Sequence, residues 1–291
     1  MENNLKHALI TGATSGIGYE LAKLFALNNY NLVLVARNKE NLDLTAREMQ
    51  ELNPSVHAHT IPVDLFEDAA AQKVYDETKR LGIDINVLVN DAGQGEWGPF
   101  SETDLQRELD IIHLNVVSLV SLTKFYLKEM VQRNEGKILQ LASSVSKAPS
   151  PLLSVYAATK AFVLSFTEAL IEEVKETDIT ITALQPYATD TDFFHKAKME
   201  NTVTYRESLM STPEEVAKAG FEGLMNGEAT VLPGVQNKVI NAMNIVTPDT
   251  MIAKNMAKQN EVSEKTSGRI NTKHTASSRE RKSIQKINGD F

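Results

Sequence analysis

The sequence contains no cysteine among its 291 residues. Disulfide bonds, thiolate nucleophiles and cysteine-based zinc sites are therefore excluded, and nothing points to an oxidising compartment. Basic charge is also scarce, since 30 Lys and Arg are outnumbered by 38 Asp and Glu, for a net charge of −8. A nucleic-acid partner is not expected, because such partners are recognised through a positively charged surface.

Two further features are missing from the sequence. No apolar run approaches the length of a membrane span, and the N-terminus lacks the charged, apolar and cleavage segments of a secretory signal. A cytoplasmic protein without an integral membrane segment is the simplest expectation. The six histidines are dispersed along the chain and no carboxylate cluster accompanies them, so no metal site is predicted.

Short apolar runs alternate with longer helical patterns along the chain. Strands are expected at 8–10, 32–35, 57–62, 87–89, 137–141, 179–184 and 230–232. Helices are expected at 18–27, 39–52, 68–81, 103–132, 155–175 and 213–225. Continuous apolar runs of this length suit strands buried on both faces. The alternation predicts an α/β fold of the Rossmann type, with a doubly wound, parallel, seven-stranded sheet and helices on both faces.

The length and the 42% hydrophobic content suit a single domain, predicted over residues 1–260. An insertion near 188–210 follows a strand's carboxyl end, where doubly wound folds bind ligands. Apolar residues at helical spacing in 235–259 fit a cover over an apolar substrate or a contact for lipid or a partner, but core packing or a subunit contact is favoured. Residues 261–291 are poor in large apolar residues and are predicted to form a disordered tail.

The first expected strand runs into a glycine-rich segment, Thr11-Gly12-Ala13-Thr14-Ser15-Gly16-Ile17-Gly18. A strand, closely spaced glycines and a helix together place a dinucleotide pyrophosphate against the N–H groups of the helix N-terminus. Gly12 permits the tight turn, Gly16 a close approach to phosphate, and Gly18 the packing of helix on strand. The G-x-x-x-G-x-G spacing differs from the common G-x-G-x-x-G fingerprint, and the alternative is an ordinary glycine turn. A dinucleotide site is the favoured interpretation.

The end of the second strand discriminates between the two nicotinamide cofactors. An acidic residue there binds a ribose 2′-hydroxyl, whereas a basic residue binds a 2′-phosphate. The sequence offers Arg37 and no carboxylate, which favours NADP(H) over NAD(H). The alternative is that Arg37 is only a solvated charge.

Tyr156 and Lys160 lie one helical turn apart and therefore share a helix face. A lysine ammonium near a phenol favours the phenolate and is expected to lower the tyrosine pKa from about 10 toward neutral pH. The pair predicts a general acid or base. Ser143 or Ser144, after the fifth strand, is expected to orient the reacting oxygen.

These features together resemble the short-chain dehydrogenase/reductase family, over about residues 5–235. The family's motifs occur in order, as Thr11 to Gly18, Asp64-Leu65, Asn90-Asp91-Ala92-Gly93, Asn115, a serine, and Tyr156 with Lys160. The thirteen-residue interval between serine and tyrosine that is usual in the family selects Ser143.

The resemblance implies roles for the catalytic residues. Tyr156 would exchange a proton with the substrate oxygen, and Lys160 would lower the tyrosine pKa and bind the nicotinamide ribose. Ser143 would hold the carbonyl, and Asn115 would keep a water that links Lys160 to solvent. The residues expected to contact the cofactor are Gly12, Thr14, Ser15, Gly16, Ile17, Gly18, Arg37, Asp64, Leu65, Asn90, Ala92, Gly93, Tyr156, Lys160, Thr189 and Thr191.

The sequence departs from the family pattern at two places. Asp91 replaces the usual asparagine, which adds a negative charge close to the cofactor unless the carboxyl is hydrogen-bonded. Gln185-Pro186-Tyr187 replaces the usual Pro-Gly after the sixth strand, so backbone freedom is lost beside the nicotinamide. Neither change removes a catalytic group.

The resulting prediction is an NADP(H)-dependent enzyme that interconverts a carbonyl and an alcohol, and the family resemblance implies a homodimer or homotetramer. Aromatic residues of the insertion are expected to line a pocket for a hydrophobic ketone or aldehyde; they are Phe193, Phe194, His195 and Tyr205. Lys196, Lys198 and Arg206 are compatible with a carrier-protein-bound substrate. The alternative function is an NADP(H)-binding sensor or regulatory protein with little turnover.

Overall fold

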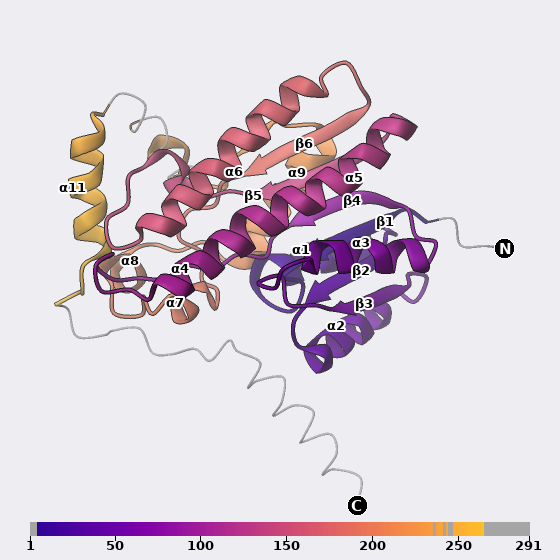
Figure 1. The fold of residues 1–291 in the computed structure, drawn as a ribbon, viewed down its shortest axis with the longest axis horizontal. Helices are drawn as coiled ribbons and strands as arrows, with labels where there is room; N and C mark the ends of the chain where they lie inside the picture. The colour runs from indigo at the N-terminus through magenta and orange to yellow at the C-terminus, as the bar shows by residue number, and fades with distance from the viewer. Residues whose placement is uncertain (1–4, 235–236, 241–242, 244–246, 265–291) are drawn as a thin grey trace, which may run out of the picture.

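The structure is a computed structural model that describes residues 5–234, 237–240, 243 and 247–264. Its centre is a seven-stranded parallel sheet in the order β3-β2-β1-β4-β5-β6-β7 (Figure 1). The strands are β1 (His7–Thr11), β2 (Asn31–Ala36), β3 (Ala58–Pro62), β4 (Ile85–Asn90), β5 (Gly136–Leu141), β6 (Ile179–Leu184) and β7 (Thr230–Val231). The predicted fold class and all seven predicted strands are confirmed.

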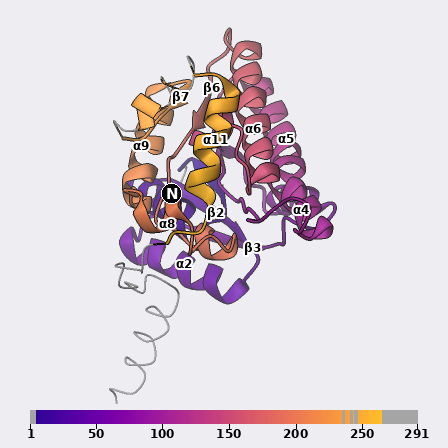
Figure 2. The same cartoon turned by 90° about the vertical axis from the view of Figure 1, so that its left-hand side faces the viewer.

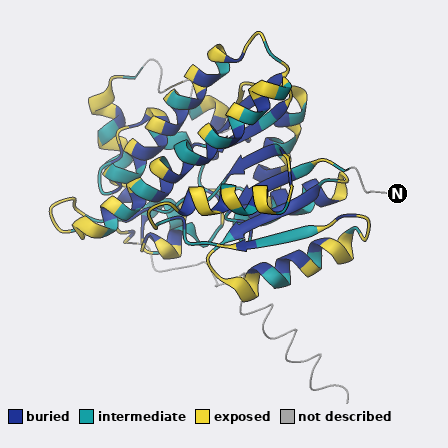
Figure 3. Ribbon diagram, turned by 45° about the vertical axis from the view of Figure 1, so that its right-hand side comes forward, coloured by how far each residue is buried: buried dark blue, intermediate teal, exposed yellow. Residues whose placement is uncertain are grey.

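Helices cover both faces of the sheet. They are α1 (Gly16–Leu27), α2 (Lys39–Leu52), α3 (Ala70–Arg80), α4 (Leu105–Ile112), α5 (Leu119–Arg133), α6 (Ser154–Glu173), α7 (Phe193–Lys196), α8 (Val203–Glu207), α9 (Pro213–Asn226) and α11 (Asp249–Asn260). One apolar cluster joins α1, α2 and α9 to the sheet, and a second joins α3, α5 and α6 to its other face. Two layers of helices therefore enclose the sheet, and its central strands are buried, whereas the edge strand β3 is mostly intermediate (Figure 3).

Strand β1 shows why the apolar runs are continuous. Ala8 and Ile10 belong to the first cluster and Leu9 to the second, and all three are fully buried. Successive side chains of a strand point to opposite faces, so a strand covered on both sides needs apolar residues at every position.

The order of the strands reverses at β1, which pairs with β2 on one side and β4 on the other. The chain crosses to one edge of the sheet first and to the other edge later. In such sheets the loops at the carboxyl ends diverge at the reversal and leave a crevice for a ligand. The crevice lies where the glycine-rich segment leaves β1.

The helix predicted over 103–132 is not a single α-helix. A π-helical turn, η1 (His113–Ser118), separates α4 from α5. Turns of this kind are frequent at functional sites, where the inserted residue moves a side chain away from the regular helical spacing. The predicted helical segment is confirmed as a continuous helix over Leu105–Arg133, and the π turn, which contains Asn115, is the feature that the sequence pattern did not indicate.

Two helical segments match a membrane span by length and composition. Leu105–Arg133 and Ser154–Glu173 each reach a mean hydropathy of 1.2, so the expectation that no apolar segment approaches that length is wrong. In the structure 44% and 39% of these windows are buried, and α5 and α6 lie side by side along one face of the sheet (Figure 1). Core helices of globular proteins have the same composition.

The insertion and the C-terminal segment pack together at the carboxyl end of the sheet. The insertion carries the short helices α7 and α8, and α11 lies beside α8 between the α6 and α9 sides of the molecule (Figure 2). Val262 forms an antiparallel bridge with Thr202. The prediction that residues from 261 onward are a disordered tail is therefore wrong for 261–264, and 265–291 lie outside the described residues.

Candidate active site

A cavity of about 630 Å³ lies at the carboxyl ends of the central strands. Its wall includes most of the predicted site residues, namely Gly12, Thr14, Ser15, Gly16, Ile17, Arg37, Asp64, Leu65, Ala92, Gly93, Ser143, Tyr156, Lys160, Thr189 and Thr191. Gly18, Asn90 and Asn115 do not line the cavity. The structure thus brings fifteen of eighteen predicted residues into one cavity wall and places three behind it.

The glycine-rich segment has the geometry of an anion site. Gly12 and Gly16 adopt left-handed backbone conformations, with φ of 71° and 59°. A Cβ at Gly18 would lie 2.6 Å from the Gly12 carbonyl oxygen, so no side chain fits there. Ser15 makes no side-chain cap at the start of α1. The first-turn N–H groups and the positive end of the helix dipole therefore favour a bound anion.

Arg37 follows β2 at the far end of the cavity. Its guanidinium lies 5.4 Å from the centre of the Phe66 ring and 3.9 Å from Asp64 Oδ2, and its side chain is 53% exposed. Asp64 also accepts a hydrogen bond from the Phe66 N–H, at 3.1 Å. Arg37 is oriented by the Phe66 ring but only loosely paired, which leaves its donors accessible to a phosphate.

Asn90 braces the sheet behind the cavity. Its amide nitrogen donates to Thr123 Oγ1 at 3.1 Å and to Gln140 Oε1 at 3.0 Å. These bonds join β4 to β5 and to α5. The structure does not support a direct cofactor contact by Asn90, since its side chain is turned into the core. Asn90 instead braces the sheet beside the site.

Asn115 connects three elements through the π turn. Its carbonyl oxygen accepts from the Gln94 N–H at 3.0 Å, and its amide nitrogen donates to Gln94 O and to Thr159 Oγ1, each at 2.9 Å. A side chain at Gly93 would contact both Asn115 Oδ1 and Lys160 Nζ. Asn115 therefore fixes the loop after β4 against α6 beside Lys160. Its water-holding role stays a prediction.

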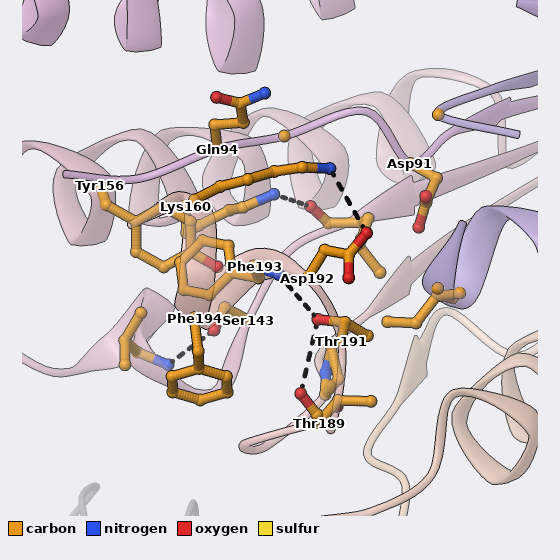
Figure 4. Close-up of a pocket in the computed structure, with 18 of the residues that line it drawn as sticks. Asp91, Gln94, Ser143, Tyr156, Lys160, Thr189, Thr191, Asp192, Phe193 and Phe194 are labelled. Carbon is orange, nitrogen blue, oxygen red and sulfur yellow. Dashed lines mark hydrogen bonds and ion pairs between the residues drawn. The ribbon is translucent and has the colours of Figure 1, made fainter. Parts of the chain in front are cut away.

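Ser143, Tyr156 and Lys160 converge on the cavity (Figure 4). Ser143 follows β5 and caps the short helix η2 (Ser144–Lys147), accepting from the Val145 N–H at 3.4 Å. Tyr156 and Lys160 share a face of α6, with Lys160 Nζ 5.8 Å from the centre of the tyrosine ring. Lys160 Nζ donates to Leu141 O at 2.7 Å. The predicted catalytic group is assembled in one place.

The pKa of Tyr156 is not lowered in this structure. Burial raises the pKa to about 12, and a hydrogen bond with Ser143 offsets only part of the effect. Burial also lowers the pKa of Lys160 to about 8, against the attraction of Asp91. The expectation of a tyrosine pKa near neutral is wrong here, because desolvation disfavours the phenolate and the charge of Asp91 raises the pKa further. At neutral pH Tyr156 holds its proton.

Thr189 and Thr191 line the cavity with their hydroxyls engaged locally. Thr189 donates to Tyr187 O at 2.8 Å, while Thr191 accepts from the Phe193 N–H at 3.3 Å. The Thr191 methyl group lies 3.2 Å from where a Cβ at Gly16 would stand. These bonds hold the start of the insertion against the glycine-rich segment.

A sequence model described as short chain dehydrogenase matches residues 6–202. The chain belongs to the short-chain dehydrogenase family. The very-long-chain 3-oxoacyl-CoA reductase of Mycosarcoma maydis is 36% identical over 182 residues, which cover 62% of this chain and 52% of that protein. The chain thus spans about half the length of the curated relatives it matches.

Solved structures of short-chain dehydrogenases superpose on the whole fold. The enzyme from Sphingobium yanoikuyae in complex with NADPH has a TM-score of 0.74 and 28% identity, with 89% of this chain and 99% of that chain covered. The bulky-bulky ketone specific alcohol dehydrogenase from Comamonas testosteroni has a TM-score of 0.70 and 29% identity, with 84% and 94% covered. The family match ends at residue 202, whereas these likenesses extend further.

The half of this short-chain dehydrogenase cavity that lies beyond Tyr156 carries a cluster of apolar side chains. Phe193 packs on Tyr156, with ring centres 4.8 Å apart, and Phe194 and Met199 are buried in the same wall. Two of the four aromatic predictions are wrong, because His195 and Tyr205 do not line the cavity. His195 bonds instead to Glu200 at 3.1 Å, and Tyr205 packs behind Phe194.

Helix α11 contributes to this wall, as in the less favoured of the two interpretations of residues 235–259. Ile252 and Met256 line the cavity from α11, and Asn260 ends that helix with its amide nitrogen donating to Ser150 Oγ at 3.0 Å and Pro151 O at 2.8 Å. Trp97 Nε1 donates to Asn260 O at 2.7 Å. Ile252 is buried and also lines the cavity, so α11 packs on the domain and forms part of the cavity wall, while a subunit contact of this segment stays a prediction. The sequence shows the helical spacing of the apolar residues in this segment, but it does not show that these residues face the cavity.

The basic residues of the insertion are mostly engaged. Lys198 forms an ion pair with the buried Glu96, and Lys196 lies 4.0 Å from Asp192. Of the three predicted cations, only Lys196 lines the cavity. These three cations therefore do not form a basic rim around the cavity that would suit a carrier protein.

Proposed function

We propose that the protein is an NADP(H)-dependent oxidoreductase that interconverts a carbonyl and an alcohol. The observation that carries the proposal is the convergence of Ser143, Tyr156 and Lys160 on a cavity whose other half is a glycine-rich anion site. A regulatory protein that only binds a dinucleotide needs the second feature but not the first.

The side chains fit a proton relay to a carbonyl oxygen. The bound nicotinamide would supply the hydride, and the oxygen then needs one proton. Tyr156 holds a proton at neutral pH because its pKa is raised to about 12, which suits it as the acid in the reductive direction. Ser143, hydrogen-bonded to Tyr156, orients the oxygen, and the Lys160 ammonium stabilises the phenolate that remains.

The preference for NADP(H) rests on the surroundings of Arg37. Its half-exposed guanidinium borders the cavity, and the loose ion pair with Asp64 leaves donors available to a 2′-phosphate. The NADPH complex of the Sphingobium yanoikuyae relative supports this choice.

We infer that the substrate is apolar and derived from a fatty acyl chain. The wall beyond Tyr156 is made of Phe193, Phe194, Met199, Ile252 and Met256, which suits a hydrocarbon chain. Relatives named very-long-chain 3-oxoacyl-CoA reductase occur in Mycosarcoma maydis and in Homo sapiens. A 3-oxoacyl thioester is therefore the first substrate class to test.

The decisive experiment measures binding and turnover separately. Calorimetric titration with NADPH and NADH is followed by assays of NADPH absorbance with 3-oxoacyl-CoA thioesters of increasing chain length and with a short polar ketone as control. Tight NADPH binding and turnover that increases with chain length are expected. Binding without turnover on any carbonyl would favour the dinucleotide-binding regulator, and binding of neither cofactor would refute the site.

We also infer a homo-oligomer. Exposed apolar side chains gather on α4 and α6, which contact each other; they are Leu105, Leu109, Ile112 and Phe162. Several exposed large apolar side chains on two neighbouring helices are typical of a protein–protein interface. Light scattering should give at least twice the 32.2 kDa chain mass, and a Leu109→Glu, Phe162→Glu double variant should give the mass of one chain. A wild-type monomer would contradict the inference.

A further inference from the structure

Asp91 is a buried carboxyl beside the anion site. It follows β4 and turns toward the glycine-rich segment (Figure 4). A Cβ at Gly18 would lie 2.6 Å from Asp91 Oδ2, and one at Gly12 would lie 3.0 Å from it. The Gly18 N–H, in the first turn of α1, hydrogen-bonds to the carboxyl, while Asp91 Oδ1 is buried without a hydrogen-bond partner. One carboxyl oxygen is thus satisfied and the other is not.

No described cation neutralises this carboxyl by direct contact. The charged and titratable groups that face it are Lys160 and Tyr156 on α6 and Lys196 on α7, and α1 contributes only the Gly18 N–H. Lys160 Nζ bonds to Leu141 O, and Lys196 lies near Asp192. Burial therefore raises the pKa of Asp91 to about 7, with Lys160 and Gly18 opposing the rise.

The same helix end has to accept two kinds of negative charge. The first turn of α1 attracts an anion, and Asp91 already lies against it. A dinucleotide pyrophosphate would place further negative charge in the same cavity wall, formed by Gly12, Gly16 and Ile17. Like charges bound at the same helix end disfavour one another, and of the two groups only the Asp91 carboxylate gains a proton readily near neutral pH.

We propose that Asp91 takes up one proton when the dinucleotide binds, so that cofactor affinity falls as the pH rises through neutrality. The inference rests on the proposed dinucleotide site. The proton moves from solvent to the carboxylate, and no other bond is made or broken. At low pH the free protein already carries this proton and binding releases or absorbs none. At higher pH the proton must be supplied on binding, which weakens affinity by up to about tenfold per pH unit.

Calorimetric titration of the full chain with NADPH tests the proposal, at pH 6, 7, 8 and 9 and in two buffers of different ionisation enthalpy. The difference in heat between the buffers counts the protons taken up. The wild type should show uptake above pH 7 and a dissociation constant that rises about threefold to tenfold per pH unit. This measurement needs no variant.

Two variants identify the group that takes up the proton when NADPH binds. Asp91→Asn keeps the acceptor for the Gly18 N–H and should make the proton uptake and the NADPH dissociation constant nearly independent of pH. Asp192→Asn removes a carboxylate from the same cavity and should leave the uptake as in the wild type. Uptake that persists in Asp91→Asn would belong to Lys160 or to the 2′-phosphate and would overturn the assignment, as would wild-type binding without uptake. Failure of every protein to bind NADPH at any pH would instead refute the proposed function.

Discussion

The two halves of the cavity are built in different ways. In the half formed by the glycine-rich segment, the contacts offered to a ligand are backbone N–H groups held by left-handed glycines. In the half formed by the insertion and α11, the contacts are side chains, chiefly aromatic residues, methionine and isoleucine. Backbone geometry follows from the fold and is specified by a short motif. A side-chain wall depends on which helix lies opposite, so it varies with far less constraint.

Tyr156 lies where the two halves meet, and its substitution gives the largest expected effect. Tyr156→Phe removes the proton donor while keeping the ring that packs on Phe193. Turnover should fall roughly 10²- to 10⁴-fold, with NADPH affinity nearly unchanged. The measurement is steady-state kinetics alongside calorimetry. A rate that stays at the wild-type level would remove Tyr156 from the mechanism.

The pH dependence of stability tests the cofactor half without any ligand. The folded-state pKa of Asp91 is raised above its unfolded value. Its contribution to the free energy of unfolding is therefore fully present below about pH 4 and is lost as the pH rises through about 7. The loss should be on the order of 2–4 kcal/mol. The Lys160 pKa is lowered to about 8, so its contribution is lost as the pH falls toward 8, in a separate range.

Urea unfolding at pH 5 and pH 7.5 measures this difference. The wild type should lose more stability between the two values than Asp91→Asn, because only the wild type carries the buried carboxyl. Equal losses in both proteins would show that Asp91 is ionised in the fold at little cost.

Asn260→Ala tests the substrate half alone. The change removes the amide that donates to Ser150 and Pro151 and releases the end of α11. Stability should fall by about 1–3 kcal/mol, because the two acceptors lose their partner. KM for a long apolar substrate should rise while NADPH affinity is kept. Lys258→Ala, an exposed change on the same helix, is the control. An equal loss of NADPH affinity would mean that the two halves are not independent.

The smallest expected effect is at Arg37. Arg37→Ala should weaken NADPH binding about tenfold or more and leave NADH binding unchanged, since only NADPH carries the 2′-phosphate. Lys39→Ala removes a nearby exposed cation that pairs with Asp43 and should change neither affinity. Competition binding with both cofactors checks the result. A parallel loss for NADPH and NADH would place Arg37 outside the phosphate site.

Much of the cofactor half could be predicted from sequence. Apolar runs such as Ala8-Leu9-Ile10 indicate strands buried on both faces, and the spacing of Gly12, Gly16 and Gly18 predicts the turn into α1. These are local patterns, and each has one dominant structural solution. Tyr156 and Lys160 could be paired for the same reason, because one helical turn brings them to one face.

The remaining features depend on contacts between distant segments. The spacing of apolar residues in α11 shows that one face is covered but not that Ile252 and Met256 face the cavity. The raised pKa of Tyr156 depends on how completely its surroundings exclude water, which the Tyr-x-x-x-Lys spacing does not encode. Asn90 belongs to the segment Asn90-Asp91-Ala92-Gly93 that resembles the family motif, yet only its hydrogen bonds to Thr123 and Gln140 show that it turns inward.

The π turn at His113–Ser118 holds one residue more than an ordinary helical turn. The turn absorbs this residue locally, so deleting one residue here would leave a regular α-helix. The buried Ile111 of α4 and the buried Tyr126 and Met130 of α5 would keep facing the core. The deletion would instead remove the displacement that places Asn115 beside Gln94 and Thr159. The extra residue therefore serves the site, and its loss should reduce activity more than stability.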